Sequence, residues 1–141
     1  MQLSGCVSTL AHTVERSVLV AASAEEVWEA LTDASLLGEW LADEVEIEPW
    51  EGGEVVCRYA DGEERRGEVS LVEEAERLAF EWRREGETPS RVELIVDAVA
   101  DGTCVTVIES GNWPGSPTLL AAGWSARLRV LPLVLGRLVP A

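Results

Sequence analysis

The sequence predicts an α+β fold, in which a curved antiparallel sheet of about seven strands wraps around a long C-terminal helix and two short helices follow the first strand. Three observations lead to this expectation: a capped helical segment directly after a Val-rich stretch, regularly spaced Gly-containing turns between alternating apolar residues, and a closing helical pattern of Leu and Trp. Because 141 residues fit a single hydrophobic core, we expect one domain over residues 13–141, after a flexible segment at residues 1–12.

The first elements are a strand and a pair of short helices. Residues 13–22 are rich in Val and Leu between small residues, which is typical of a strand. Ser23 and Glu26 form a capping box, which marks the start of a helix directly after that strand. A second short helix is expected at residues 34–41, with Trp40 turned to the core. Helices this short have little stability alone, so both must pack against the sheet.

Alternation with a period of two predicts strands through the middle of the chain. The pattern begins at residue 43, and turns such as Asp61-Gly62 and Asp101-Gly102 then divide the chain at regular intervals. After the acidic first strand of this run, the expected strands are residues 54–60, 65–73, 78–84, 91–99 and 104–110. Apolar residues on one face of each strand would supply a continuous surface for the C-terminal helix.

The longest helical pattern begins near residue 117 and contains a proline. Pro132 lacks a backbone donor and clashes with the preceding turn, so we expect a kink or a break near Leu131. Residues 130–139 are apolar nearly all round, but they are too few to span a bilayer, which needs about 20 residues. Closure of the core is the favoured interpretation of this segment, ahead of a self-association surface and of a lipid contact.

The charge balance argues against nucleic-acid binding. The chain carries 26 acidic and 11 basic residues, for a net charge of −15. Such a field repels phosphate backbones, and the arginines are scattered rather than gathered in one basic patch. Every basic residue is Arg, so Schiff-base chemistry at a lysine is excluded.

Cysteines and carboxylates indicate neither a disulfide framework nor a metal site. Cys6, Cys57 and Cys104 are odd in number and widely spaced, without a CxxC pair, so a reducing cytoplasm is the expected location. The acidic residues 43–54 alternate along one strand, and carboxylates spaced in this way lie too far apart to converge on one ion. We therefore expect no metal and no cofactor.

Several segments together resemble a known family. In order, they are VWEALTD, EWL, DGEERRGEV, RLAFEW, SRVEL and DGTCVTVIESG, followed by a GW pair. From about Val14 to about Trp124, this pattern resembles the START-related superfamily, which includes polyketide cyclases and lipid-transfer domains. It is similar in particular to the branch named after the homologue of the heat-shock-protein ATPase activator. The resemblance implies a helix-grip fold with a cavity between sheet and long helix. The chain departs from the usual amphipathic ending after Trp124, where it carries Pro132.

A cavity of this kind favours the binding of a small hydrophobic or aromatic molecule. The pocket is expected to be apolar with few polar groups, and the alternative is a packed core without a void. Two tryptophans, one on the second short helix and one before the long helix, would stand near its mouth. The residues expected to bind the ligand are Trp40, Tyr59, Val69, Phe80, Trp82, Leu94, Trp113, Trp124 and Leu128.

An enzyme using the same cavity is an alternative, since the resemblance includes cyclases and dehydratases. His12 precedes the first strand in a polar segment and is expected to be structural or disordered. Cys57 and Cys104 lie on strands without a histidine partner, so they are interpreted as small buried hydrophobes. The other candidates are two carboxylates and two arginines, Glu109, Glu81, Arg16 and Arg58. Because half of every strand faces outward, we expect all four at the surface and assign no catalytic residue.

A protein-interaction module is the third alternative. The family's name suggests a co-chaperone-like role, but the eukaryotic co-chaperones of this branch carry a further domain, for which this chain has no room. Homodimerisation through the apolar C-terminal segment is the more plausible form of this alternative.

Overall fold

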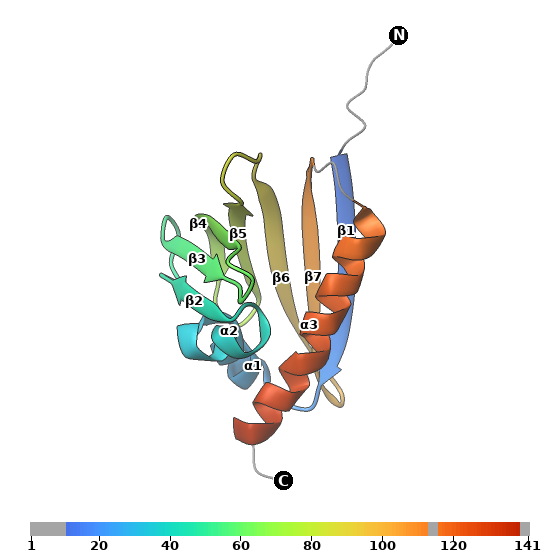
Figure 1. The fold of residues 1–141 in the computed structure, drawn as a ribbon. Helices are drawn as coiled ribbons and strands as arrows, with labels where there is room; N and C mark the ends of the chain where they lie inside the picture. Colours follow the sequence, from blue (N-terminus) through green and yellow to red (C-terminus); the bar gives the residue numbers. More distant parts are fainter. Residues whose placement is uncertain (1–10, 113–115, 139–141) are drawn as a thin grey trace.

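A computed structural model describes residues 11–112 and 116–138 of the chain. The elements are β1 Ala11–Val20, α1 Ala24–Thr32, α2 Ala34–Trp40, β2 Glu44–Ile47, β3 Glu54–Arg58, β4 Glu64–Glu73, β5 Arg77–Arg83, β6 Ser90–Val99, β7 Gly102–Asn112 and α3 Pro117–Leu138. The strands form one seven-stranded antiparallel sheet in the order β1-β7-β6-β5-β4-β3-β2. The sheet curves around α3, while α1 and α2 close one end (Figure 1). The predicted helix-grip α+β fold is confirmed.

The two short helices begin at the caps that their sequences indicate. At α1, Glu26 N–H donates to Ser23 Oγ over 3.2 Å, and Ser23 N–H donates to Glu26 Oε1 over 2.9 Å. At α2, Asp33 accepts from Leu36 N–H over 3.1 Å. Both caps satisfy backbone donors that a helix start leaves free. Since Leu31 is 0% exposed, α1 also packs against the core, as expected of a helix too short to be stable alone.

The strands bury one face, and one of them approaches its neighbour unusually closely. Leu78, Phe80 and Trp82 alternate along β5 and are all buried. Gly67 on β4 lies opposite Trp82, and a Cβ at Gly67 would lie only 1.5 Å from the carbonyl oxygen of Glu81. The missing side chain therefore allows β5 to bring Trp82 onto the inner face of the sheet.

The sheet begins slightly earlier than the sequence indicated. β1 starts at Ala11, and His12 lies opposite Gly111 of β7. The expectation of a loose segment around His12 was therefore wrong, because ladder pairing with β7 extends the strand beyond its Val-rich part. Residues 1–10 lie outside the described residues.

α3 is continuous through its proline. It runs from Pro117 to Leu138 with Pro132 inside it, so the helix does not break near Leu131. Leu131 is 0% exposed and Val134 1% exposed, which anchors the helix in the core on both sides of the proline. Tertiary packing here outweighs a local preference.

α3 is also long and apolar enough to cross a membrane by length and composition, over Pro117–Gly136. In this fold, however, it is the helix that the sheet surrounds. Trp124, Leu128 and Leu131 are buried within the same core as the strands, as expected of the central helix of a helix-grip domain.

Candidate functional site

Glu109 is a buried carboxylate on the inner face of the sheet. Along β7, Thr103, Val105, Val107 and Glu109 alternate toward the core, and Glu109 is only 1% exposed. The expectation that Glu109 faces solvent was wrong, because Glu109 occupies one of the alternate positions of β7 whose side chains face inward. A charged group at such a position requires hydrogen-bond partners.

Three donors surround the Glu109 carboxylate. Oε2 accepts from the indole N–H of Trp82 over 2.9 Å and also from the hydroxyl of Ser90. Oε1 accepts from the indole N–H of Trp124 over 2.8 Å. The two indole rings stack, with centroids 6.2 Å apart and an interplanar angle of 25°. One carboxylate on β7 thus connects β5, β6 and α3.

Two arginines lie over the rings of this aromatic pair. The guanidinium carbon of Arg65 lies 4.7 Å from the ring centroid of Trp82, and that of Arg127 lies 4.8 Å from the ring centroid of Trp124. Both also lie over the ring of Tyr59, at 5.6 Å and 5.7 Å. These distances are within the range of cation–π attraction, which holds the guanidinium groups near the rings.

The hydrogen-bonding capacity of this cluster is not fully used. Arg127 Nη1 and the Tyr59 hydroxyl are buried and have no hydrogen-bond partner among the described residues. Burial raises the pKa of Tyr59, in spite of the nearby charges of Arg127 and Arg65, so its hydroxyl stays neutral at ordinary pH.

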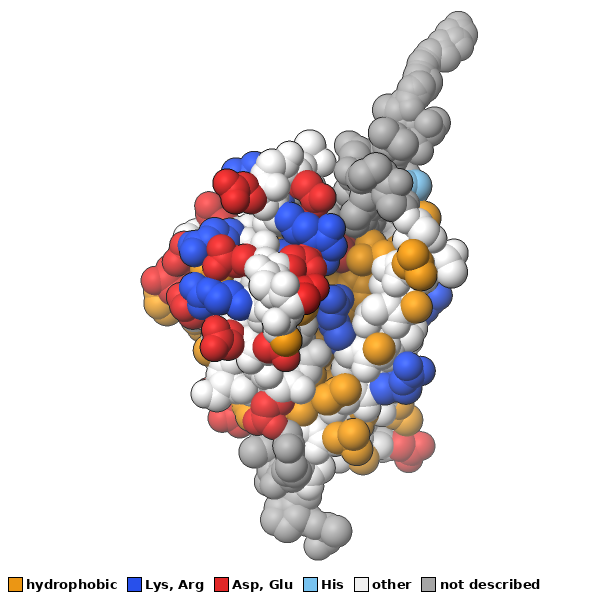
Figure 2. Space-filling view, viewed as in Figure 1, with side chains coloured by type: hydrophobic (Ala, Val, Ile, Leu, Met, Phe, Trp, Pro, Cys, Tyr) orange, Lys and Arg blue, Asp and Glu red, His pale blue; other side chains and the backbone are white. Residues whose placement is uncertain are grey.

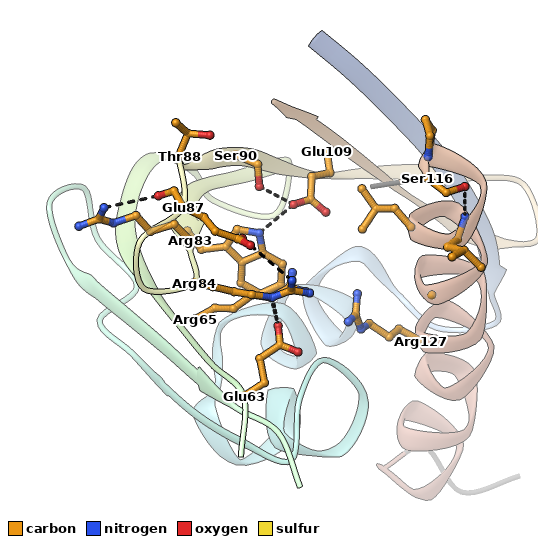
Figure 3. A pocket seen from close by; sticks show the side chains of 15 residues that line it. Glu63, Arg65, Arg83, Arg84, Glu87, Thr88, Ser90, Glu109, Ser116 and Arg127 are labelled. Carbon is orange, nitrogen blue, oxygen red and sulfur yellow. Dashed lines mark hydrogen bonds and ion pairs between the residues drawn. The ribbon is translucent and has the colours of Figure 1, made fainter. Parts of the chain in front are cut away.

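A pocket of about 620 Å³ opens beside this cluster, between α3 and the strands β4 to β7. Its lining consists of Glu63, Arg65, Trp82, Arg83, Arg84, Glu87, Thr88, Ser90, Glu109, Ser116, Pro117, Leu119, Leu120, Gly123 and Arg127. Charged side chains gather on the sheet side of this hollow, and apolar side chains lie within it and along α3 (Figure 2). Arg127 reaches from α3 toward the sheet, and Glu109 reaches from the sheet toward α3 (Figure 3). The pocket is therefore mixed in character, whereas an apolar pocket with few polar groups was expected.

Glu63 organises the sheet-side arginines of the pocket. It forms an ion pair with Arg65 over 3.1 Å and a second one with Arg84. Partial burial disfavours the ionised form of Glu63, but the hydrogen bonds from Arg84 and Arg65 outweigh it, so its pKa lies below the ordinary value. Arg84 also forms an ion pair with Glu87 over 3.7 Å. Glu63, Arg65, Arg84 and Glu87 are therefore linked along one side of the pocket.

Of the described residues that were expected to bind a ligand, Trp82 is the one that lines this pocket. Trp124 lies behind the lining and is connected to it through Glu109. Phe80, Val69, Leu94 and Leu128 are buried in the core, and Tyr59 packs against that core and under the two arginines.

Two other tryptophans were expected near the mouth of the pocket. Trp40 is 4% exposed, and its indole N–H donates over 3.0 Å to the carbonyl oxygen of Ala30 in α1. It lies among the buried core residues rather than in the pocket lining. Trp113 lies outside the described residues.

The charged candidates other than Glu109 lie apart from it. Glu81 is exposed on β5, and Arg58 pairs with Glu46 and Glu64 over 2.7 Å and 3.0 Å. Arg16 donates to the hydroxyl of Ser125 over 3.2 Å. As expected, these three lie at the surface.

Neither described cysteine is arranged as a nucleophile. Cys57 is buried, and burial raises the pKa of its thiol to about 12. Cys104 is partly buried, and both thiols are free. Among residues 11–112 and 116–138, no three His, Cys, Asp or Glu side chains lie close enough together to hold a metal ion.

Sequence reasoning missed most of the polar lining. Arg65 and Arg127 were not singled out, although Arg127 follows Trp124 at the helical spacing of three. Gly123 and Leu120, on the same helix, also line the pocket. The alternation of Val105, Val107 and Glu109 was visible, and it could have placed the carboxylate inside.

The family model described as activator of Hsp90 ATPase homolog 1-like protein matches residues 21–136. The chain belongs to this family. No curated protein matches the sequence. The match covers every element from α1 to all but the last residues of α3, and therefore includes the whole pocket lining.

Solved structures share the fold over most of the chain. MLL2253 from Mesorhizobium loti has a TM-score of 0.85 at 23% identity, over 92% of this chain and 100% of that one. DynU16, described as a protein in the dynemicin biosynthetic locus, has a TM-score of 0.81 at 29% identity, over 91% of this chain and 48% of that one. The Aha1 dimer from Colwellia psychrerythraea has a TM-score of 0.73 at 18% identity, over 88% of this chain and 96% of that one. These similarities support the helix-grip assignment.

Proposed function

We propose that this protein binds a small molecule with a hydrophobic or aromatic body in the pocket between the sheet and α3. The observation that carries the proposal is the hollow of about 620 Å³ beside the buried Glu109 cluster. Its volume falls within the range of roughly 300–1,000 Å³ that is usual for small-molecule sites. The proposed location of this binding activity is the cytoplasm, where the free thiols of Cys57 and Cys104 would remain reduced.

The lining offers both kinds of contact that such a ligand needs. Leu119 and Leu120 on α3 supply apolar surface, and Trp82 supplies part of an aromatic wall. Ser90 and Glu109 add polar groups at fixed positions, because they hydrogen-bond to each other. DynU16, which belongs to a biosynthetic locus, supports a small organic ligand over a macromolecule.

Native mass spectrometry of gently purified protein tests the proposal directly. A retained ligand would appear as excess mass that disappears under denaturing conditions. Gly123 offers a way to block the pocket, because a Cβ added there meets no atom within 4 Å. We expect Gly123→Leu to fill part of the pocket and to abolish the excess mass.

Gly136 supplies the matched control for that experiment. It lies on the same helix, its added Cβ also meets no atom within 4 Å, and it is not part of the lining. Gly136→Leu should therefore retain the excess mass. A ligand that stays bound in Gly123→Leu would locate binding elsewhere. If wild-type protein also shows no binding to a panel of apolar and aromatic compounds, the proposal fails.

Catalysis in the same pocket would have to involve Glu109, the one described carboxylate that is both buried and part of the lining. Its two oxygens already accept from Trp82, Ser90 and Trp124. We therefore propose a positioning role for Glu109, in which it fixes the aromatic wall of the pocket.

Self-association through α3 is a second candidate function. Leu133 is 69% exposed and Val130 37% exposed, and both line a shallow groove with Glu39. Large apolar side chains gathered at a surface are typical of interaction sites. Light scattering tests this candidate: a wild-type dimer that becomes monomeric in Leu133→Glu would support it, and a wild-type monomer would exclude it.

A further inference from the structure

We propose that the pocket selects ligands that carry an acidic group, and that Arg127 is the counter-ion for that group. This inference rests on the proposed binding function and adds the chemical class of the ligand: an aromatic carboxylate or sulfonate. The starting point is the position of Arg127, a cation that no described residue of the protein pairs with.

Arg127 belongs to the lining of the pocket, on the α3 side. Its guanidinium packs over Trp124 at 4.8 Å and over Tyr59 at 5.7 Å. Among the described residues, it takes part in no ion pair, and its Nη1 is buried without an acceptor. A cation that is shielded from water and lacks a counter-charge raises the free energy of the folded protein. An anion bound in the pocket would remove much of this free-energy cost.

The other lining arginines differ in this respect. Arg65 pairs with Glu63 over 3.1 Å, and Arg84 pairs with both Glu63 and Glu87. Arg83 is exposed, so water solvates its charge. Arg127 is therefore the arginine of this lining that combines shielding from water with the lack of a carboxylate partner.

The charge of the pocket also differs from that of the whole chain. Its lining contains four Arg and three Glu, an excess of one positive charge, whereas the chain as a whole carries −15. The negative charge of Glu109 is already shared among three hydrogen-bond donors. An anion approaching this acidic protein would thus meet less repulsion at this pocket than the net charge of the chain implies.

The shape of the site adds a second requirement. A guanidinium presents a planar fork of donors, which suits the paired oxygens of a carboxylate or sulfonate. The remaining lining on α3 is apolar at Leu119 and Leu120, next to Trp82 across the pocket. A ring that bears one acidic group meets both requirements at once.

Two fluorescent probes that differ by one acidic group test the inference. 8-Anilinonaphthalene-1-sulfonate carries a sulfonate on the ring system that N-phenyl-1-naphthylamine presents without charge. We expect wild-type protein to bind the sulfonate about tenfold more tightly, because only the sulfonate can accept a charge-assisted hydrogen bond from Arg127. High salt should reduce this preference.

Variants then assign the preference to Arg127. Arg127→Gln should lose the preference for the sulfonate while it still binds the neutral probe. Arg127→Lys, which retains the charge but not the planar fork, should keep part of the preference. Arg129→Gln makes the same charge change at an exposed position of α3 outside the lining and should bind like wild type. Far-ultraviolet circular dichroism verifies that each variant is folded.

The outcomes separate the two proposals. If both probes bind with equal affinity to wild-type protein, or if Arg127→Gln keeps the full preference, the anion inference is overturned while the binding function stands. If neither probe binds, the anion inference is overturned, and the panel of apolar and aromatic compounds then decides whether the binding function stands. Gly123→Leu should prevent binding of both probes, and undiminished binding in that variant would place them at another surface and overturn the inference.

Discussion

Trp82 and Trp124 donate their indole N–H groups to the two oxygens of one buried carboxylate, Glu109, while their rings stack 6.2 Å apart. The first indole belongs to the sheet and the second to α3. Through this arrangement, the central helix is attached to the sheet by directional bonds next to the pocket, in addition to non-directional apolar packing. Stability and pocket geometry therefore depend on the same three residues.

Loss of the Glu109 carboxylate should destabilise the fold. Glu109→Leu leaves two indole N–H donors without their acceptor, and each unsatisfied buried donor costs about 1–3 kcal/mol. Urea unfolding monitored by tryptophan fluorescence measures the change in the free energy of unfolding. Glu81→Gln, at an exposed position of β5, is the control and should change it by less than about 0.5 kcal/mol. A Glu109→Leu variant as stable as wild type would contradict the bridging role.

Two glycines should respond to alanine in opposite ways. Gly67→Ala places a Cβ 1.5 Å from the carbonyl oxygen of Glu81, so we expect a large fall in the thermal unfolding midpoint. Gly136→Ala adds a Cβ in open space on α3 and should stabilise the protein by about 0.5–1 kcal/mol, because alanine favours helix over glycine. Calorimetry measures the thermal unfolding midpoints of the two variants. A midpoint of Gly67→Ala equal to that of Gly136→Ala would show that β4 and β5 can separate at low cost.

Stability should depend on pH through Glu63. Its pKa is lower in the folded protein than the ordinary 4.5, so ionised Glu63 stabilises the fold above that value. This contribution is lost as the pH falls through the lowered pKa. We expect Glu63→Gln to be less stable than wild type at neutral pH, with a difference that shrinks as the pH falls below about 4.5. Urea unfolding across this pH range measures the difference in the free energy of unfolding between the two proteins. A difference that does not change with pH would show that Glu63 acts only by packing.

The Cys57 thiol should be unreactive in the native protein. Burial raises its pKa from 9.0 to about 12, so at pH 8 the folded protein holds almost no thiolate, which is the reactive form. Because the folded pKa is higher than the unfolded one, the associated stability is present below pH 9 and is lost as the pH rises toward 12. Iodoacetamide labelling, resolved by peptide mass spectrometry, should modify Cys57 only in denaturant. Labelling under native conditions would indicate local opening of β3.

Much of the fold could be predicted because local signals and tertiary packing agree. The capping box at Ser23 and the Gly-containing turns place α1 and most strands within one or two residues of their observed bounds. Pro132 is the exception: its local preference for a break is outweighed by burial of Leu131 and Val134 on either side of it. A sequence shows such a preference directly, but not the packing that opposes it.

The site was harder to predict than the fold. Alternation shows that half of each strand faces inward, and the apolar neighbours Val105 and Val107 determine which half. Applying that phase to Glu109 would have placed the carboxylate inside. Arg127 carries no comparable signal, since a long side chain on a helix can turn toward the core or toward water. Its position depends on the ring of Trp124, three residues before it, and on the ring of Tyr59, which comes from a distant part of the chain.

The stacked indoles also provide the protein with an optical signal of its own. Two chromophores held 6.2 Å apart at a fixed angle of 25° couple their electronic transitions, and this coupling depends steeply on separation and orientation. Because one ring moves with the sheet and the other with α3, any displacement of the helix would alter the circular dichroism of the pair. The molecule can thus report the opening of its own interior without an added label.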